Sequence, residues 1–387
     1  MQPFSSSFTI LLSTIFLALS SPEFVDAVPT APRLDQRQVD QVGQTHNSSL
    51  VRRAPGIVRI PLSSLGEDLA FTSQVNVGTN HGPFVMQMDT GSSDFWVYAD
   101  VCPQRGTHKF ASRATSASMN VSPQHKWGFR YGDGTQVNGI IAQDTLAIGS
   151  VQVPSYIFGL LGIIQGPIAT KPIDGIVGLG TAAGSRTGVP NFIHMLRQNG
   201  VIPANTMSWK LPRRADGGHG GELSIGGPNP NLFDPATEVT VNSINGGFWR
   251  VPIAGVKISG VPFAAIAGGR IGTLDTGSTG LVVPLGDAAN LNSQFPNPLR
   301  DSQTGLFWVP CNAKLQMSLT IGGRDWPIDP RDLRLVDTQT PQGYCMSTIQ
   351  AGPPSLQGTW IAGGAFLKNV YSTMDFDTNQ VKLAVLR

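Results

Sequence analysis

Two short stretches decide how this chain is organised: residues 88–93 (MDTGSS) and residues 274–279 (LDTGST). Each has an apolar residue, then Asp-Thr-Gly, then two hydroxyl residues. A given tripeptide occurs by chance roughly once in 8,000 residues, so two copies in one context indicate an internal repeat. A second marker follows each copy at nearly the same distance, as IVG at residues 176–178 and IAG at residues 361–363. The chain therefore has two halves built on one plan.

The residue types of the repeat indicate its chemistry. An apolar stretch that delivers Asp into a Thr-Gly turn places a carboxylate at the end of buried backbone. Two such turns that face each other would bring Asp89 and Asp275 together. Like charges at hydrogen-bond distance cannot both ionise, so the pair would hold one proton between them. One carboxylate can then activate a water as base while the other acts as acid, and no metal or cofactor is required.

The composition favours an all-β fold. The 387 residues include 45 Gly and 29 Pro, and only 13% are charged, which is poor in helix formers and rich in turn residues. Short β-branched runs recur between Gly-rich turns, at residues 71–77, 84–88, 139–141, 151–153 and 238–242. One helix is expected at residues 190–199, because the stretch begins with Pro and ends before Gly200.

Several function classes are disfavoured by the same sequence. The net charge is only +2, without a long run of either sign, so no nucleic-acid partner is indicated. The six histidines are scattered and no CxxC occurs, so no metal site is expected. No GxSxG stretch points to a serine nucleophile.

The amino-terminal segment is typical of a secreted precursor. A dozen mostly apolar residues, 8–19, are too short to span a bilayer and predict a signal peptide over residues 1–27. Residues 28–53 are polar and end in a pair of arginines, which predicts a propeptide cleaved after Arg53. The carboxyl end has no long apolar tail, so we expect a secreted, extracellular protein without a membrane anchor.

Taken in order over about residues 66–387, these motifs resemble the pepsin-like aspartic proteases that fungi secrete. The resemblance implies two β-rich lobes, residues 54–229 and 230–387, with a long cleft between them. It also implies a monomer that hydrolyses peptide bonds in extended polypeptides at acidic pH. Large apolar residues would flank the cut, and pepstatin-type inhibitors would bind.

The resemblance also assigns roles to the two turns. Asp89 and Asp275 match the catalytic pair. The threonine hydroxyls would lock the two turns together, and the serine hydroxyls would bond the outer carboxylate oxygens. The residues expected to support the pair are Thr90, Gly91 and Ser92 in the first turn and Thr276, Gly277 and Ser278 in the second.

A hairpin at residues 129–135 resembles the flap that closes over substrate in this family. Tyr131, Gly132 and Asp133 would contact the substrate, and Trp96 matches the tryptophan that supports the flap tyrosine. In fungal relatives an acidic residue at the position of Asp133 is associated with accepting lysine before the scissile bond.

Further expectations concern the cysteines and a modification. Cys311 and Cys345 occupy the family's second-lobe disulfide positions, whereas Cys102 has no partner in the first lobe. Asn120, in Asn-Val-Ser, is a candidate N-glycosylation site, and Asn47 would leave with the propeptide.

Two positions depart from the family pattern. Gly280 follows the second turn where an apolar residue is common, and Gly364 stands where most members have Asp. Neither removes an atom that the chemistry needs, so we expect any effect to fall on local rigidity.

Two other function classes remain to be weighed. A catalytically silent member of the same fold would be a binding or inhibitor protein, but such relatives commonly lose a catalytic Asp, and here both turns are intact. A glycosidase also uses two carboxylates, although on separated faces of a sugar and without this repeat.

Overall fold

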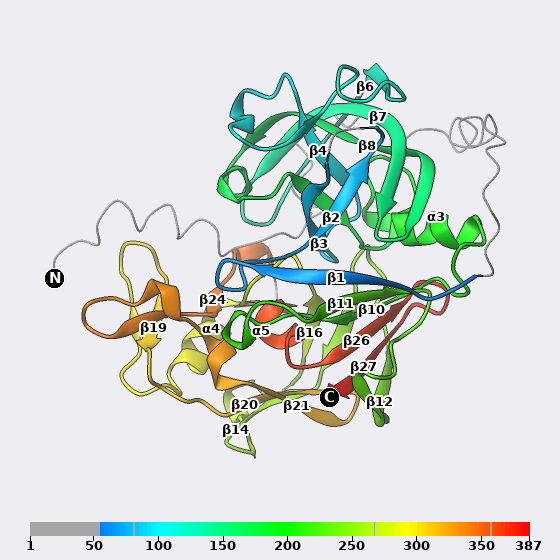
Figure 1. The fold of residues 1–387 in the computed structure, drawn as a ribbon. Coiled ribbons are helices and arrows are strands. Elements are labelled where there is room, and N and C mark those ends of the chain that lie inside the picture. The colour runs from blue at the N-terminus through cyan, green and yellow to red at the C-terminus, as the bar shows by residue number, and fades with distance from the viewer. Residues whose placement is uncertain (1–54, 80–81, 267, 357) are drawn as a thin grey trace.

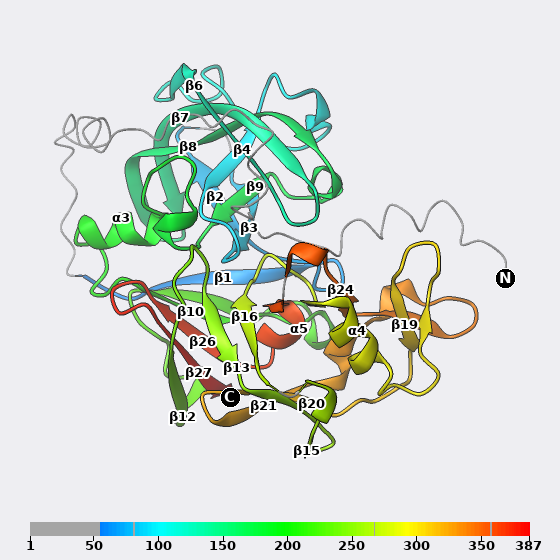
Figure 2. The same ribbon diagram turned by 180° about the vertical axis from the view of Figure 1, so that it is seen from behind.

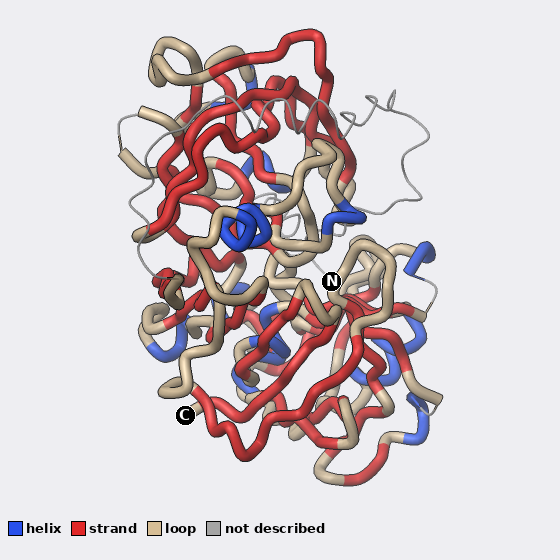
Figure 3. Tube along the Cα trace, turned by 90° about the vertical axis from the view of Figure 1, so that its right-hand side faces the viewer, coloured by secondary structure: helices blue, strands red, loops and turns tan. Residues whose placement is uncertain are grey.

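The computed structural model describes residues 55–79, 82–266, 268–356 and 358–387. It has two lobes, one above the other in Figure 1, and the side view in Figure 3 shows that strands dominate both. The expected all-β, bilobal pepsin-like fold is therefore confirmed. The predicted signal peptide, the predicted propeptide and Asn47 lie outside the described residues.

One large sheet runs through both lobes. Its strands are β1 (Val58–Leu65), β2 (Ala70–Val77), β3 (Phe84–Asp89), β4 (Phe95–Ala99), β5 (Phe110–Ala111), β6 (Asn120–Arg130), β7 (Gln136–Ile148), β8 (Val151–Gln165), β9 (Gly175–Gly178), β10 (Thr206–Lys210), β11 (Gly221–Ile225), β12 (Phe233–Asn242), β26 (Tyr371–Asp375) and β27 (Gln380–Leu386). Their order is β12-β27-β26-β10-β11-β1-β2-β3-β9-β4-β8-β7-β6, with β5 beside β4. β1 pairs first with β11 and then with β2, so it joins the two lobes where Figures 1 and 2 show it between them.

Three smaller sheets complete the lower lobe. Their strands are β13 (Arg250–Ile253), β14 (Gly255–Ile258), β15 (Val261–Pro262), β16 (Arg270–Leu274), β17 (Leu281–Val283), β18 (Leu299–Arg300), β19 (Phe307–Pro310), β20 (Met317–Ile321), β21 (Arg324–Ile328), β22 (Arg334–Leu335), β23 (Tyr344–Ser347), β24 (Ile349–Ala351) and β25 (Thr359–Ala362). The strand orders are β13-β16-β25-β17-β24, β15-β14-β20-β21 and β18-β19-β23-β22.

The sequence repeat reappears as a repeat of topology. In the first half, β2-β3-β9-β4-β8 pair antiparallel, parallel, antiparallel and parallel in turn. In the second half, β13-β16-β25-β17-β24 pair in the same succession. Each Asp-Thr-Gly turn follows the same strand of this unit, since Asp89 ends β3 and Asp275 directly follows β16. The two aspartates therefore occupy equivalent places.

The expected helix is present as α3 (Phe192–Gln198). It begins two residues after Pro190, because Asn191 is its N-cap and its side chain accepts a hydrogen bond from the backbone N–H of His194. The structure also contains α4 (Leu285–Asn292) and α5 (Gly364–Leu367), which the sequence did not predict. Neither helix has the side-chain hydrogen bond at its N-cap that marks the start of α3.

The apolar core continues from one lobe into the other. Buried side chains from β1 to β27 form one cluster that includes Trp209, Trp249 and Trp360. Complete burial of a large apolar side chain contributes about 1.5–3 kcal/mol, so this shared core holds the lobes together. The expected boundary near residue 230 falls between β11 and β12, which lie in the same sheet, and it stays a prediction.

Candidate active site

The two Asp-Thr-Gly turns are joined by a symmetric set of hydrogen bonds. The Thr90 backbone N–H donates to Thr276 Oγ1 at 3.0 Å, and the Thr276 N–H donates to Thr90 Oγ1 at 3.0 Å. Each hydroxyl also donates across to the other half, Thr90 to Leu274 O at 2.8 Å and Thr276 to Met88 O at 2.7 Å. Four buried hydrogen bonds therefore hold the turns in one orientation.

Each carboxylate is held by its own turn in the same way. The Gly91 N–H donates to Asp89 Oδ1 at 2.8 Å and Ser92 Oγ donates to Asp89 Oδ2 at 2.5 Å. In the second turn, Gly277 N–H and Ser278 Oγ donate to the two oxygens of Asp275 at 2.8 and 2.6 Å. Both carboxyl groups are fully buried. Every bond of the first turn thus has its counterpart in the second.

The two turns are in close contact. A Cβ atom built on Gly277 would lie 2.3 Å from Asp89 Oδ1 and 3.0 Å from Asp275 Oδ1, so only glycine fits between the carboxyl groups. Gln87 adds a further contact, because its Nε2 donates to Gly277 O at 3.1 Å. The expectation that the repeat brings Asp89 and Asp275 together is therefore met by the structure.

Burial shifts the titration of both carboxyl groups. It raises the pKa of Asp89, against the lowering effect of Ser92 and Gly91. It raises the pKa of Asp275 well above the ordinary value, and the charge of Asp89 raises it further. Two buried carboxyl groups in contact favour a state with one shared proton. The arrangement can therefore supply one acid and one base from the same pair.

The hairpin expected to form the flap belongs to a second apolar cluster in the first half through Phe129 and Tyr131. Trp96 Nε1 donates to Tyr131 Oη at 2.7 Å, and both side chains are buried. Phe129 packs on Tyr131, with ring centroids 4.6 Å apart. At the tip, Gly132 is exposed and Asp133 accepts hydrogen bonds from Thr135 N and Thr135 Oγ1 at 2.7 and 3.0 Å. The hairpin is thereby closed on itself and anchored by Trp96.

The second markers of the repeat lie directly against the turns. β3 runs parallel to β9, with Asp89 opposite Gly178, and the Leu179 N–H donates to Asp89 O at 2.7 Å. In the other half, Asp275 N–H donates to Ala362 O at 3.1 Å. Trp249 Nε1 of the second half donates to Leu179 O at 3.3 Å. The two marker segments therefore fix the point at which each Asp-Thr-Gly turn leaves its sheet.

The two departures from the family pattern have a packing reason. A Cβ on Gly280 would lie 2.2 Å from Thr348 O, and one on Gly364 would lie 2.8 Å from Phe71 Cε2. The Gly364 N–H donates to Ser278 O at 2.8 Å, directly behind the second turn. Glycine at these positions lets neighbouring segments approach.

Two buried charged residues near the site were missed by the sequence analysis. Asp94 accepts hydrogen bonds from Ser185 Oγ at 2.7 Å and from Trp127 Nε1 at 3.2 Å, and so ties the strand after the first turn to the flap strand β6. Lys171 is 2% exposed and lies within the electrostatic reach of both catalytic candidates. For Lys171, the signal available in the sequence was a single lysine in the apolar run before β9.

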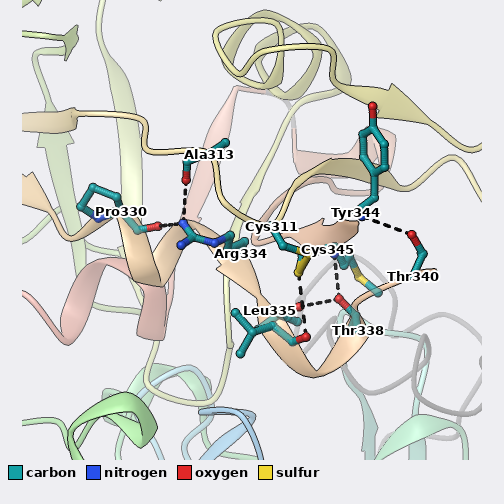
Figure 4. The surroundings of a disulfide bond; sticks show 11 residues. Cys311, Ala313, Pro330, Arg334, Leu335, Thr338, Thr340, Tyr344 and Cys345 are labelled. Atoms are coloured by element: carbon teal, nitrogen blue, oxygen red, sulfur yellow. Dashed lines mark hydrogen bonds between the residues drawn. A yellow bond between two sulfur atoms is a disulfide. The ribbon is translucent and has the colours of Figure 1, made fainter. Parts of the chain in front are cut away.

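The second half alone carries a disulfide, between Cys311 and Cys345. Figure 4 shows it beside the segment from Pro330 to Tyr344, where Thr338 Oγ1 donates to Leu335 O at 2.5 Å. Cys102 is buried with a free thiol. The bridge closes a loop of 34 residues, which stabilises a fold by about 3–4 kcal/mol.

Three remaining expectations concern glycosylation, metal binding and a membrane span. Asn120 is exposed at the start of β6, opposite Gln143, and its glycosylation stays a prediction. Within the described ranges, no group of three or more His, Cys, Asp or Glu residues is arranged to hold a metal ion. No helix in that same part of the chain has the length and apolar character needed to cross a bilayer.

Comparison with known proteins gives a consistent match. Residues 70–386 match the family model described as eukaryotic aspartyl protease. The chain is 30% identical over 323 residues to a probable aspartic-type endopeptidase CTSD of Arthroderma benhamiae, an alignment that covers 82% of this chain and 61% of the relative. It is 26% identical over 336 residues to rhizopuspepsin of Rhizopus chinensis, which covers 85% and 81%. The chain thus spans about three fifths of the length of the first relative.

Proposed function

Because the chain belongs to the eukaryotic aspartyl protease family, we propose that it is a secreted acid endopeptidase. Its substrates would be extended polypeptides, bound between the two lobes with large apolar residues on either side of the cut. Asp89 and Asp275 would form the catalytic pair. The relative from Arthroderma benhamiae is named a probable aspartic-type endopeptidase, and this supports peptide-bond hydrolysis as the reaction.

One observation carries this proposal: two buried carboxyl groups held by equivalent hydrogen bonds on two cross-linked turns. A merely structural aspartate is compensated by cations or by several N–H donors. Here each carboxylate has one backbone N–H and one hydroxyl, and the other carboxylate is its neighbour. That arrangement is unfavourable for folding and useful for acid–base catalysis.

The proposed mechanism follows from the shared proton. A water held between the two carboxyl groups loses its proton to the ionised partner as its oxygen attacks the peptide carbonyl carbon. The protonated partner donates a hydrogen bond to the carbonyl oxygen and stabilises the negative charge that develops there. Collapse of the tetrahedral intermediate then transfers a proton to the leaving nitrogen, and the C–N bond breaks. No covalent bond to the protein is formed.

The other residues near the pair would position it. Thr90 and Thr276 hold the turns at a fixed distance, and Ser92 and Ser278 orient the outer oxygens. Tyr131, supported by Trp96, would close over the peptide and exclude water, which aligns the scissile bond with the attacking water.

Cleavage of a denatured protein at about pH 3 to 5 tests the proposal. The secreted protein should cut it, pepstatin should abolish the cutting, and the Asp89→Ala variant should be inactive. Sequencing of the products then gives the residues that flank the cut. No cleavage by a folded, correctly processed chain would contradict the proposal and would favour the silent binding protein of the same fold.

A further inference from the structure

Gln87 is a polar side chain buried in the strand that leads to the first aspartate. It lies two residues before Asp89 in β3, where its neighbours on the adjoining strands are Thr72 of β2 and Ile176 of β9. Its exposed fraction is 0%. Glutamine is mostly an exposed residue, and its burial costs free energy unless its amide is hydrogen-bonded, so its presence here calls for a physical role.

The amide of Gln87 reaches from the first half of the chain to the second. Its Nε2 donates a hydrogen bond to Gly277 O at 3.1 Å, in the turn that carries Asp275. A carbonyl oxygen can only accept, so this contact requires the NH₂ group of the amide on that side. The other amide atom, Oε1, is buried and has no hydrogen-bond partner among the residues that the structure describes. The bond to Gly277 is therefore what the buried amide contributes.

The acceptor of this bond lies in the middle of the proposed catalytic pair. The Gly277 N–H donates to Asp275 Oδ1 at 2.8 Å. Gly277 is also packed so closely against Asp89 that a Cβ atom on it would overlap Asp89 Oδ1. The glycine is thus held on both sides, by Asp275 at its N–H and by Gln87 at its carbonyl. A shift of Gly277 would move Asp275 Oδ1 relative to Asp89.

The residue at the equivalent place in the second half makes no such bond. Thr273 lies two residues before Asp275, as Gln87 lies two residues before Asp89. Thr273 is also 0% exposed, but its Oγ1 has no hydrogen-bond partner in the described ranges. Gln87 therefore adds a link in one direction only, from the first half to the second turn, to the reciprocal links that Thr90 and Thr276 make.

We propose that Gln87 is a positioning residue, which holds Gly277 O and thereby fixes the carboxyl group of Asp275 against that of Asp89 so that the two can share a proton. The inference rests on the proposed function and deepens it by naming a residue outside both Asp-Thr-Gly turns that sets their relative position. Gln87 acts through Gly277 and does not touch the reacting atoms. A small displacement of a reacting group lowers the rate without a loss of binding.

Gln87→Met tests the role of the donor. Methionine has nearly the length of glutamine and cannot donate a hydrogen bond. With a peptide identified from the digest of the denatured protein, kcat at pH 4 should fall about tenfold, because the pair loses its alignment. KM should stay unchanged, because the side chain is fully buried. The melting temperature should change little, because the loss of the donor to Gly277 O is offset by removal of the unpaired Oε1.

Gln87→Glu is the conservative variant that should rescue the rate. Burial raises the pKa of a carboxyl group, so the new side chain should be protonated at pH 4 and its O–H can donate to Gly277 O. This variant should keep most of the wild-type kcat at pH 4. As the pH rises and the carboxyl group ionises, the donor is lost, so the ratio of its kcat to that of the wild-type protein should fall.

Thr273→Val is the matched control, because it changes the equivalent position in the other half. It removes a buried hydroxyl that has no hydrogen-bond partner among the described residues and keeps the shape of the side chain. Its kcat and KM should equal those of the wild-type protein.

Three results would overturn the inference. They are a wild-type kcat in Gln87→Met, a fall of its melting temperature in step with its kcat, and a kcat ratio of Gln87→Glu that does not depend on pH. The last measurement does not depend on the folding of the methionine variant. If the wild-type protein cleaves no peptide, the proposed function itself fails, whereas cleavage by the wild-type protein and Gln87→Met at equal rates refutes the inference alone.

Discussion

The two Asp-Thr-Gly turns are alike in backbone and different in surroundings. Each carboxylate receives one glycine N–H and one serine hydroxyl, and each threonine reaches across to the other turn. The flap, Trp96 and Lys171 belong to the first half only, and the disulfide belongs to the second half only. The repeat therefore fixes the geometry of the pair, whereas the difference between its two members has to come from groups outside the repeat.

The pKa shifts express that difference. The hydrogen bond with Asp275 and the charge of Lys171 both hold down the pKa of Asp89, although burial still raises it. The charge of Asp89 and the hydrogen bond with it raise the pKa of Asp275 further. Because the two groups titrate as one coupled pair, the shared proton belongs to the pair, and their unequal surroundings are where the symmetry of the two turns breaks. The predictions below test where the symmetry holds and where it breaks.

The largest effect is expected from removal of either charge. Asp89→Asn and Asp275→Asn should each lower kcat by about 10⁴-fold or more, because one member of an acid–base pair cannot act alone. Steady-state cleavage of a chromogenic peptide at pH 4 measures both. Thermal unfolding of the same variants should show a folded protein. Retention of more than about 1% of activity by either variant would contradict the pairing.

The disulfide tests a feature that only the second half has. Cys311→Ala with Cys345→Ala should lower the free energy of unfolding by about 3–4 kcal/mol, the value for a loop of this length. Cys102 is a buried cysteine of the first half that forms no disulfide, and Cys102→Ala should lower the free energy of unfolding by about 1 kcal/mol. Denaturant unfolding gives both values. A double variant with the unfolding free energy of the wild-type protein would mean that the bridge adds nothing to stability.

The threonine cross-links should respond symmetrically. Thr90→Val and Thr276→Val each remove two buried hydrogen bonds and leave one backbone N–H and one carbonyl without a partner. Each variant should lose about 2–4 kcal/mol of unfolding free energy, and kcat should fall in parallel. The exposed Thr107→Val is the matched control and should change little. A loss confined to one of the two threonines would break the symmetry.

The flap gives the smallest of these effects, and only the first half can show it. Tyr131→Phe keeps the ring and removes the hydroxyl that accepts from Trp96 Nε1 at 2.7 Å. Because the buried indole N–H loses its partner, unfolding free energy should fall by about 1–3 kcal/mol, and kcat/KM should fall about tenfold. Peptide cleavage together with thermal unfolding measures the two effects. An unchanged kcat/KM would show that Tyr131 does not position the substrate.

Much of the fold and of the site could be read from the sequence because both depend on local patterns that occur twice. Asp89 and Asp275 were found by the repeat, and the order of the later markers led to the family. The strands expected at residues 71–77 and 84–88 are present as β2 and β3. The roles of the individual site residues remain proposals.

Other features depend on contacts that no local pattern encodes. The buried position of Lys171 depends on two such contacts. The 3₁₀ helix η3 (Pro167–Thr170) is hydrogen-bonded to Thr135 through Ile168 N, and Leu69 O in the β1–β2 turn accepts a hydrogen bond from Lys171 Nζ. The helix α5 begins with Gly364 directly after the N-cap Gly363, and glycine has poor helix propensity, so its first turn is set by backbone contacts such as Gly364 N to Ser278 O. Tertiary packing therefore overrides the local signal in both cases.

The most direct test of the shared proton is the pH dependence of kcat/KM for a neutral peptide. The pair must hold one proton, and burial raises the pKa of both carboxyl groups. Activity should therefore be present at acidic pH, fall at the acid end when both groups are protonated, and be lost toward neutrality as the last proton leaves the pair. The upper limb should lie above the ordinary pKa of an aspartate. A rate that rises steadily through pH 8 would contradict the paired carboxyl mechanism.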